Sequence, residues 1–155
     1  MSVDGESVFL VIFRLAERLF ALHLEAVERA VRVVDVTPLP GAPQIVVGAV
    51  DVEGRIVPVL DVCRRFGMPA REIELTDQLL LARCSSRTVA LLVEGVAGVA
   101  RRPRSEIVRV ETVEPRTEYV EGILQLEDGM VLIHDLERFL SPDEQRVIAT
   151  VMMDK

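Results

Sequence analysis

The sequence predicts an all-β protein with one C-terminal helix, built as two five-stranded barrels related by internal duplication. Half of the 155 residues are hydrophobic but only 4% are aromatic, so the core must be assembled from Val, Leu, Ile and Ala. Such a composition favours strands. Short apolar runs alternate with polar turns, and two kinds of segment occur twice in the same order.

The duplication is visible in two alignments. Residues 14–32 match residues 83–101 at 7 of 19 positions, and residues 46–64 match residues 120–138 at 6 of 19. This composition would give about two chance matches in either window. Because the two segments alternate along the chain, they indicate two related lobes.

The first repeated segment predicts a hairpin followed by a third strand. In the first copy the arms are "FLVIFRL" and "LFALHL" around residues 16–18, and in the second they are "QLLLARC" and "TVALLV" around residues 85–87. An acidic residue, Glu25 or Glu94, follows each hairpin. The next stretches, "ERAVRVV" and "AGVARR", are too β-branched and too short for a stable helix, so a third strand is predicted.

The second repeated segment predicts another hairpin, "VVGAVDVEGRIVPVLDV" in one copy and "YVEGILQLEDGMVLIHDL" in the other. Gly54 and Gly129 lie at the turns, where glycine supplies the positive φ that tight hairpins require. Pro58 cannot donate a ladder hydrogen bond, which places it at an edge, a bulge or a barrel rim. Five closely connected strands per lobe are typical of a small closed barrel.

Helices are few. Residues 62–66 predict a short turn that ends at Gly67. A longer helix is predicted over residues 142–153, because Ser141 is a suitable N-cap, Pro142 suits the first position and Glu144 completes a capping box. The face of this helix expected to pack on a barrel carries Val147, Ile148, Val151 and Met152.

The whole chain, residues 1–155, is predicted to form a single domain. Its two intertwined lobes cover about residues 9–68 and 77–140, and the acidic stretch 69–77 connects them. The C-terminal helix follows the second lobe.

Charge and composition exclude several classes of function. A net charge of −7 and a pI near 4.9 argue against a general binder of nucleic acid or anionic membranes. Arg101, Arg102 and Arg104 form the one basic cluster, in a predicted connector without aromatic neighbours, so a solvated turn is expected there. The apolar runs are too short to cross a bilayer. Cys63 and Cys84 form no metal or redox motif, which favours a reducing cytoplasm.

No pattern of catalytic or metal-binding residues stands out. His23 and His134 have no partners at ligand spacing, and neither a calcium loop nor a phosphate-binding glycine loop is present in the sequence. Asp61 and Asp135 recur at equivalent positions, which favours a structural role as caps of the following turns. The sequence therefore predicts a protein that is not an enzyme and that holds no metal and no cofactor.

The order of the motifs resembles the CheW family of bacterial chemosensory proteins. The resemblance runs from about Phe9 to Leu140 and rests on P-x-P-G-A-P, G-x-V, G-R-x-V-P-V-x-D and L-V-x-x-V. It implies two five-stranded SH3-like barrels with strands exchanged between them. It also implies a non-catalytic adaptor that joins the cytoplasmic tips of chemoreceptors to the regulatory domain of a CheA-type histidine kinase.

The resemblance further implies where a receptor would bind, in a groove between the barrels, while the kinase-binding residues stay unassigned. Helix-in-groove recognition uses apolar residues with a few orienting charges. The residues at the matching positions are Val27, Arg29, Val50, Asp51, Val52, Glu53 and Gly54.

Two of these positions depart from the family pattern. Members commonly carry V-x-E-[IV] where this chain has Arg29, and N-[LI]-R-G where it has Glu53. Two opposite changes predict an ion pair of reversed polarity, and independent drift on an exposed surface is the alternative. If the pair exists, it favours a dedicated receptor or a chemosensory system that does not control motility.

Two other classes of function stay open at this stage. One is a regulatory domain that binds only the kinase or only the receptor, and the other is an enzyme or small-ligand sensor with a polar pocket. The expected location is the cytoplasm, with membrane receptor arrays reached only through partners.

Overall fold

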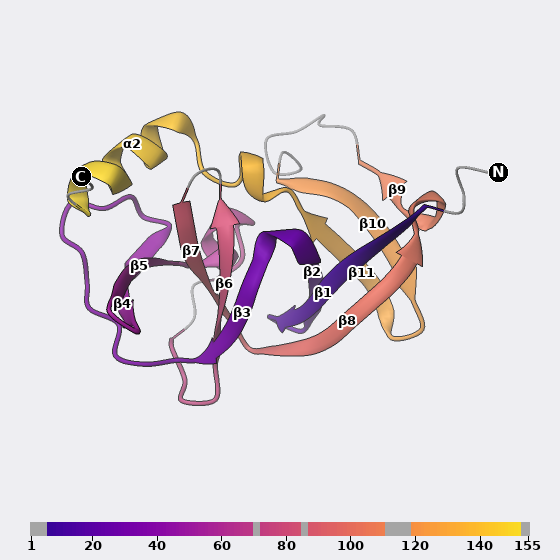
Figure 1. Ribbon diagram of the computed structural model, residues 1–155, viewed down its shortest axis with the longest axis horizontal. Helices are drawn as coiled ribbons and strands as arrows, with labels where there is room; N and C mark the ends of the chain where they lie inside the picture. Colours follow the sequence, from indigo (N-terminus) through magenta and orange to yellow (C-terminus); the bar gives the residue numbers. More distant parts are fainter. Residues whose placement is uncertain (1–5, 70–71, 85–86, 111–118, 153–155) are drawn as a thin grey trace.

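A computed structural model describes residues 6–69, 72–84, 87–110 and 119–152, which form two β-sheets and a C-terminal helix (Figure 1). The first sheet, called here the six-stranded lobe, contains β1 (Ser7–Leu15), β2 (Arg18–His23), β8 (Gly95–Pro103), β9 (Val108–Arg109), β10 (Val120–Leu126) and β11 (Gly129–His134). The second sheet, the five-stranded lobe, contains β3 (Val27–Arg32), β4 (Val46–Val52), β5 (Arg55–Leu60), β6 (Gln78–Cys84) and β7 (Arg87–Val93). The predicted fold class, all-β with two lobes and a final helix, is confirmed.

The two sheets repeat one strand order. The six-stranded lobe runs β8-β1-β2-β11-β10-β9, and the five-stranded lobe runs β3-β6-β7-β5-β4. The hairpin β1–β2 therefore pairs with strands from the C-terminal half, and the hairpin β6–β7 pairs with strands from the N-terminal half. Parallel pairing of β2 with β11, and of β5 with β7, joins each exchanged hairpin to its sheet. The repeat in the sequence thus corresponds to a repeat in the fold, with hairpins exchanged between lobes.

The six-stranded lobe has one strand more than the five predicted. Its extra strand, β9, pairs with β10 beside Gly122 and Ile123. In the five-stranded lobe the corresponding place holds an isolated bridge between Thr37 and Ala49, and Ala49 aligns with Ile123 in the repeat. A strand of two residues is too short to leave an alternating pattern, which is why the sequence did not predict it.

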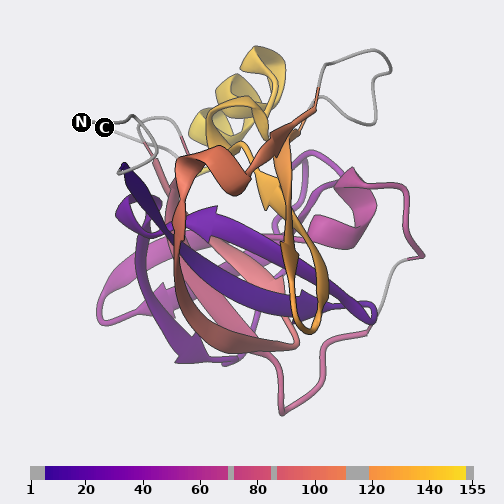
Figure 2. The same ribbon diagram turned by 90° about the vertical axis from the view of Figure 1, so that its right-hand side faces the viewer.

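Gly48 and Gly122 align in the repeat and lie where β4 and β10 shift register against their partners. A Cβ atom on Gly48 would lie 2.4 Å from the backbone oxygen of Thr37, and one on Gly122 would lie 2.9 Å from that of Val108. The missing side chain lets a neighbouring segment cross each strand closely. Figure 2 shows the curvature of the six-stranded lobe that results in part from such bulges.

The central strands are buried on both faces, which explains their uninterrupted apolar sequences. In β1, Leu10 and Ile12 face the interior of the six-stranded lobe, whereas Val11 and Phe13 face a larger core shared by the two lobes. The strand β6 divides its side chains between the shared core and the interior of the five-stranded lobe in the same way. Because alternate side chains of a strand point to opposite faces, each of these strands contributes to two cores.

An aromatic cluster occupies the shared core. The ring of His134, at the end of β11, lies 4.8 to 5.6 Å between centroids from the rings of Phe13, Phe20, Phe66 and Phe139. Both ring nitrogens of His134 are buried without a hydrogen-bond partner. The cluster therefore joins the six-stranded lobe to Phe66, at the end of the α1 turn (Val62–Arg65) that follows β5.

The predicted caps are present. The Asp61 side chain accepts a hydrogen bond from the Cys63 backbone N–H at 2.9 Å and begins α1 (Val62–Arg65). The Asp135 side chain accepts from the Glu137 N–H at 3.1 Å and begins the 3-10 turn η5 (Leu136–Arg138). Two further 3-10 turns, η2 (Leu24–Ala26) and η3 (Arg104–Glu106), follow β2 and β8. The recurring aspartates are therefore structural, as the repeat predicted.

The C-terminal helix α2 (Pro142–Val151) begins with the predicted capping box of Ser141 and Glu144. It ends at Val151 rather than continuing to 153, and residue 153 lies outside the described residues. Ile148 is buried in the shared core. Arg65 of α1 donates a hydrogen bond to Glu144 at 2.7 Å, so α2 is also fixed to the first half of the chain.

Candidate docking site

All seven residues predicted at the receptor-binding site belong to the five-stranded lobe, on β3 and on the β4–β5 hairpin. These two elements lie at opposite edges of the sheet, and the curl of the sheet brings them together. Arg29 on β3 donates a hydrogen bond from Nη2 to Oε1 of Glu53 at 2.6 Å. The predicted ion pair is therefore present, and both side chains are exposed.

A second ion pair lies beside the first. Arg55 Nη2 donates to Glu28 Oε1 at 2.8 Å, and the Thr88 hydroxyl donates to Glu28 Oε2 at 2.7 Å. The hydrogen bonds from Arg55 and Thr88 hold the pKa of Glu28 below its ordinary value. We call Glu28, Arg29, Glu53 and Arg55 the ion-pair cluster. The cluster connects β3 to the hairpin through two ion pairs. In one pair β3 supplies the arginine, and in the other it supplies the glutamate.

The hairpin tip is a tight turn with two residues at positive φ, Glu53 at 51° and Gly54 at 84°. Asp51 stabilises this turn, because its Oδ1 accepts a hydrogen bond from the Gly54 N–H at 2.7 Å. The acidic residue before the turn is thus a structural element of the hairpin. The turn presents the Glu53 side chain toward β3.

The three valines of the predicted set differ from the charged residues in placement. Val50 and Val52 are buried in the core of the five-stranded lobe, and Val27 is half-buried. Their side chains position the hairpin and β3 rather than offering an exposed surface. The exposed apolar residue here is Ile56, opposite Asp51 in the hairpin register and 55% exposed.

Three further residues lie at this candidate site and were not in the predicted set: Glu28, Arg55 and Ile56. A signal for the first two exists, because Glu28-Arg29 and Glu53-x-Arg55 place opposite charges side by side in both segments. The period of two could have marked Ile56 as outward-facing, since Val57 and Val59 on the same strand face the core.

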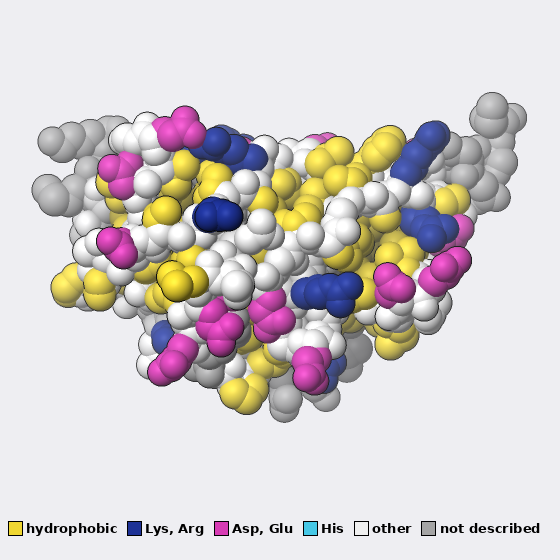
Figure 3. All heavy atoms as spheres, turned by 90° about the horizontal axis from the view of Figure 1, so that it is seen from below, with side chains coloured by type: hydrophobic (Ala, Val, Ile, Leu, Met, Phe, Trp, Pro, Cys, Tyr) yellow, Lys and Arg dark blue, Asp and Glu magenta, His cyan; other side chains and the backbone are white. Residues whose placement is uncertain are grey.

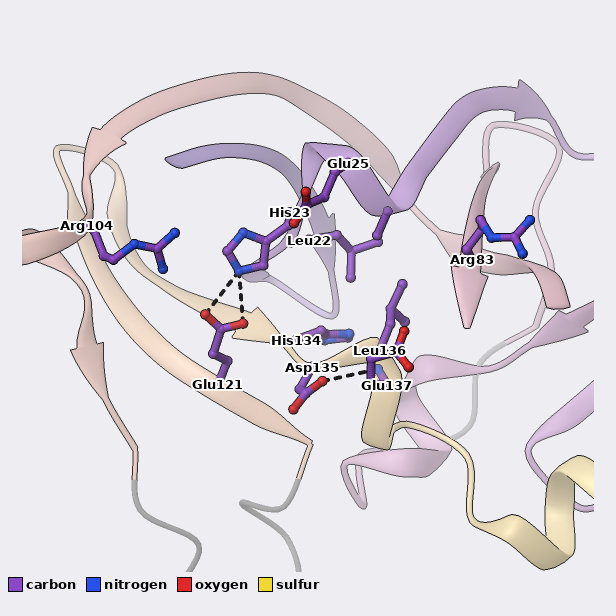
Figure 4. Close-up of a pocket in the computed structure, with 11 residues that line it drawn as sticks. Leu22, His23, Glu25, Arg83, Arg104, Glu121, His134, Asp135, Leu136 and Glu137 are labelled. Carbon is purple, nitrogen blue, oxygen red and sulfur yellow. Dashed lines mark hydrogen bonds and ion pairs between the residues drawn. The ribbon is translucent and has the colours of Figure 1, made fainter. Parts of the chain in front are cut away.

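A cleft of about 500 Å³ lies elsewhere, between the β2–β3 connection and the end of β11 (Figure 4). Within it, His23 Nε2 lies 2.9 and 3.0 Å from the two carboxylate oxygens of Glu121. The hydrogen bond to Glu121 raises the pKa of His23, against the opposing effect of burial, and it lowers the pKa of Glu121. Figure 4 shows Arg104 and Glu25 on the same side of the cleft as this pair.

The pair makes stability depend on pH. Because the folded-state pKa of His23 lies above 6.5, its contribution is fully present below pH 6.5 and is lost as pH rises through that raised pKa. We expect His23→Gln to lower the free energy of unfolding by up to about 1 kcal/mol at pH 5.5 and by less at pH 8.5. Urea denaturation at the two pH values measures this, and an equal loss at both would contradict it.

The two cysteines, Cys63 and Cys84, are both buried as free thiols. Burial raises the pKa of the Cys84 thiol to about 12, so the nucleophilic thiolate is not formed at neutral pH. Among the described residues, no cluster of three or more His, Cys, Asp or Glu side chains is arranged to hold a metal ion. The described helices include none long and apolar enough to span a membrane.

Two β lobes that exchange hairpins define the structural class of this protein. Residues 10–144 match the family model described as the CheW-like domain, and the chain therefore belongs to the CheW-like family. The resemblance read from the sequence is confirmed.

Individual relatives agree with this assignment. The chain is 28% identical over 142 residues to "Chemotaxis protein CheW" of Rhizobium meliloti, covering 90% of this chain and 91% of the relative. It is 24% identical over 157 residues to the protein of the same name from Treponema pallidum, covering 97% and 92%. A crystal structure of the scaffolding protein TtCheW from Thermoanaerobacter tengcongensis superposes with a TM-score of 0.80 at 27% identity, covering 90% of this chain and 96% of that one.

Proposed function

We propose that this protein is a non-enzymatic adaptor that couples chemoreceptors to a CheA-type histidine kinase in a bacterial chemosensory array. The observation that carries the proposal is the match of nearly the whole chain to a family whose members are named as chemotaxis and scaffolding proteins. The partners are the cytoplasmic tip of a receptor and the regulatory domain of the kinase. The protein acts in the cytoplasm, through partners and without inserting into the membrane.

The receptor contacts the surface formed by β3 and the β4–β5 hairpin. Its exposed charges, Arg29 and Glu53, orient the receptor, and Ile56 adds apolar area at the edge. The polarity of the pair selects a receptor whose charges are complementary to it, and such a receptor would be a dedicated one or would belong to a system that does not control motility.

A three-component pull-down tests the proposed function. Tagged kinase regulatory domain, receptor-tip fragment and this chain are combined in pairs and together. An adaptor retains the receptor fragment on the kinase only when this chain is present. A protein that binds one partner and never both would be a one-sided regulatory domain, and the adaptor proposal would be wrong.

Reversing the charges tests the receptor surface. We expect Arg29→Glu to weaken receptor-tip binding about tenfold, because it places two carboxylates together and presents the wrong sign to the partner. The free energy of unfolding should change by less than about 1 kcal/mol, since exposed ion pairs contribute little to stability. Isothermal titration calorimetry and urea denaturation measure the two effects.

The double variant Arg29→Glu, Glu53→Arg provides the control. It restores an ion pair within the protein but reverses its polarity. Recovery of stability without recovery of receptor binding assigns the pair to partner choice. Full recovery of binding by the double variant would show that the pair only supports the hairpin.

A further inference from the structure

Two consecutive residues of β3, Glu28 and Arg29, both bind the β4–β5 hairpin, although neighbours in a regular strand point to opposite faces of the sheet. A β-bulge explains this. Val27 pairs with Ala82 of β6 and Arg29 pairs with Leu81, so Glu28 is the extra residue between the two pairings. The bulge of β3 is therefore at Glu28.

The bulge changes the face to which the side chains of β3 point. Before it, Val27 packs against the shared core, to which its partner Ala82 also belongs. After it, Arg29 is opposite Leu81, a residue of the core of the five-stranded lobe. Without the bulge, Arg29 would lie on the same face as Val27. The bulge thus turns Arg29 toward the five-stranded lobe and its hairpin.

The carboxylate of Glu28 reaches across the sheet. Its Oε1 accepts a hydrogen bond from Arg55 Nη2 at 2.8 Å, and its Oε2 accepts one from the Thr88 hydroxyl at 2.7 Å. Thr88 lies on β7 and Arg55 on β5, and β6 lies between β3 and these two strands. Because these hydrogen bonds keep the pKa of Glu28 below its ordinary value, the carboxylate is charged at neutral pH. Arg55 is therefore bound to a charged group far along the sheet.

Arg55 stands two residues after Glu53, on the other side of the hairpin turn. An arginine so close in the chain is a competitor for the Glu53 carboxylate, but Arg55 binds Glu28, and Glu53 is bound by Arg29 at 2.6 Å. Figure 3 shows acidic and basic side chains lying among apolar ones on the face seen from below. On such a mixed surface, the charge that a partner meets depends on which neighbouring groups are already paired.

We propose that Glu28 is a positioning residue of the candidate docking site. By binding Arg55, together with Thr88, it leaves the Glu53 carboxylate to Arg29. The pair presented to a partner is then Arg29–Glu53, with its arginine on β3 and its carboxylate on the hairpin. Without the charge of Glu28, Arg55 competes for Glu53 and the Arg29 guanidinium is released. The consequence for receptor binding rests on the proposed function.

NMR of the arginine side chains tests the positioning role without any partner. At low temperature, couplings across hydrogen bonds between guanidinium nitrogens and carboxylate carbons should identify the pairs Arg29–Glu53 and Arg55–Glu28 in the unmodified chain. In Glu28→Gln, the coupling of Arg29 to Glu53 should weaken, and a coupling of Arg55 to Glu53 should appear. An unchanged Arg29–Glu53 coupling, with none from Arg55 to Glu53, would overturn the proposal.

Thr88→Val and Thr88→Ser provide a matched pair of variants. Thr88→Val removes the hydroxyl donor, so the pKa of Glu28 should rise toward its ordinary value and Arg55 should be held less firmly. Thr88→Ser keeps a hydroxyl and should behave like the unmodified chain. Titration of the Glu28 carboxylate by carbon-13 NMR measures the pKa. The same pKa in both variants would show that Thr88 has no part in positioning.

A second experiment measures the consequence for a receptor. Glu28→Gln should bind a receptor-tip fragment about fivefold more weakly than the unmodified chain. The double variant Glu28→Gln, Arg55→Gln should recover to within about twofold, because the competitor for Glu53 is gone. Arg55→Gln alone should also bind within about twofold of the unmodified chain. Thermal unfolding confirms that each variant is folded.

The rescue distinguishes positioning from a purely structural role. If Glu28 only supported the fold of β3, removing Arg55 as well would not restore binding. Unweakened binding by Glu28→Gln, or no rescue in the double variant, would therefore overturn the role of Glu28 in receptor binding. If the unmodified chain binds no receptor fragment, the proposed function fails, while the NMR couplings still decide whether Glu28 keeps Arg55 away from Glu53.

Discussion

Replacing Gly48 with alanine should destabilise the protein by about 3 kcal/mol, the largest effect expected from such a replacement among the glycines in the described part of the chain. The new Cβ would lie 2.4 Å from the Thr37 backbone oxygen, 2.8 Å from Val36 Cγ1 and 2.9 Å from the Thr37 carbonyl carbon. Two of these atoms belong to backbone that is held by reciprocal hydrogen bonds between Thr37 and Ala49 at 2.8 Å. The clash cannot be relieved by rotating a side chain, so the bridge must break or β4 must move.

Two other glycines make this prediction specific. Gly122→Ala should cost about 2 kcal/mol, because its nearest neighbour, Ile107 Cγ2 at 2.7 Å, can rotate but the Val108 oxygen at 2.9 Å cannot. Gly95→Ala is the matched control in β8, where the nearest atom is the Gln78 side-chain oxygen at 3.8 Å. Urea denaturation followed by circular dichroism should rank the losses Gly48, Gly122, Gly95. Equal losses at Gly48 and Gly95 would contradict the packing argument.

This pair of glycines also shows what the sequence could and could not reveal. The alignment of Gly48 with Gly122 was visible, because both stand two residues after the start of a repeated segment. The reason for the alignment was not visible, because the crowding atoms belong to Thr37 and to Val108 of β9, in segments without any repeated sequence pattern. The close approach of two backbone segments depends on the fold. In the sequence its only sign is a glycine at the position of contact.

Elements set by local chemistry were predicted well. The hairpin turn at Gly54, the caps at Asp61 and Asp135, and the capping box at Ser141 all depend on residues within four positions of each other. The choice of sheet for each hairpin depends instead on pairings between distant segments. The sequence repeat could not distinguish hairpins kept in their own half from hairpins exchanged, and only the resemblance to a known family implied the exchange.

The residues of the candidate site also differ in how well local sequence predicts their placement. Arg29 and Glu53 were predicted to pair because both depart from a family pattern, and their contact joins β3 to a hairpin at the other edge of the sheet. Val50 and Val52 were placed in the same set by position alone. Their burial follows from the alternation of β4, which sends every second side chain into the core. Contact between distant edges, by contrast, depends on how far the sheet curls, which the sequence does not state.

The second large effect concerns His134, whose buried ring should make the protein sensitive to acid. Burial lowers the pKa of His134 to about 3. Since the unfolded chain binds this proton near pH 6.5, the protein is fully stable in this respect above that value and loses stability as pH falls from 6.5 toward 3. A shift of this size corresponds to roughly 5 kcal/mol in total.

His134→Leu and His134→Phe test this, because neither side chain can take up a proton. At pH 7 the variants should be more stable than the unmodified protein by about 1 to 2 kcal/mol, since they remove two buried ring nitrogens that have no hydrogen-bond partner. The leucine and phenylalanine side chains differ in shape, and either of them could pack poorly against Phe20, Phe66 and Phe139. Two variants are therefore used. If overpacking dominates in one, the other should still show the gain.

The measurement is the free energy of unfolding from urea titrations at pH 7, 6, 5 and 4. The advantage of the variants over the unmodified protein should widen with each step down, because only the unmodified protein must exclude a proton from the shared core. Carboxylates that titrate in the same range are present in all three proteins and cancel in the difference. The His23–Glu121 pair also titrates, but it is present in all three proteins and cancels in the same way. If stability changes with pH equally in all three proteins, His134 is hydrated or hydrogen-bonded in solution. The aromatic cluster would then be packed less tightly than its geometry indicates.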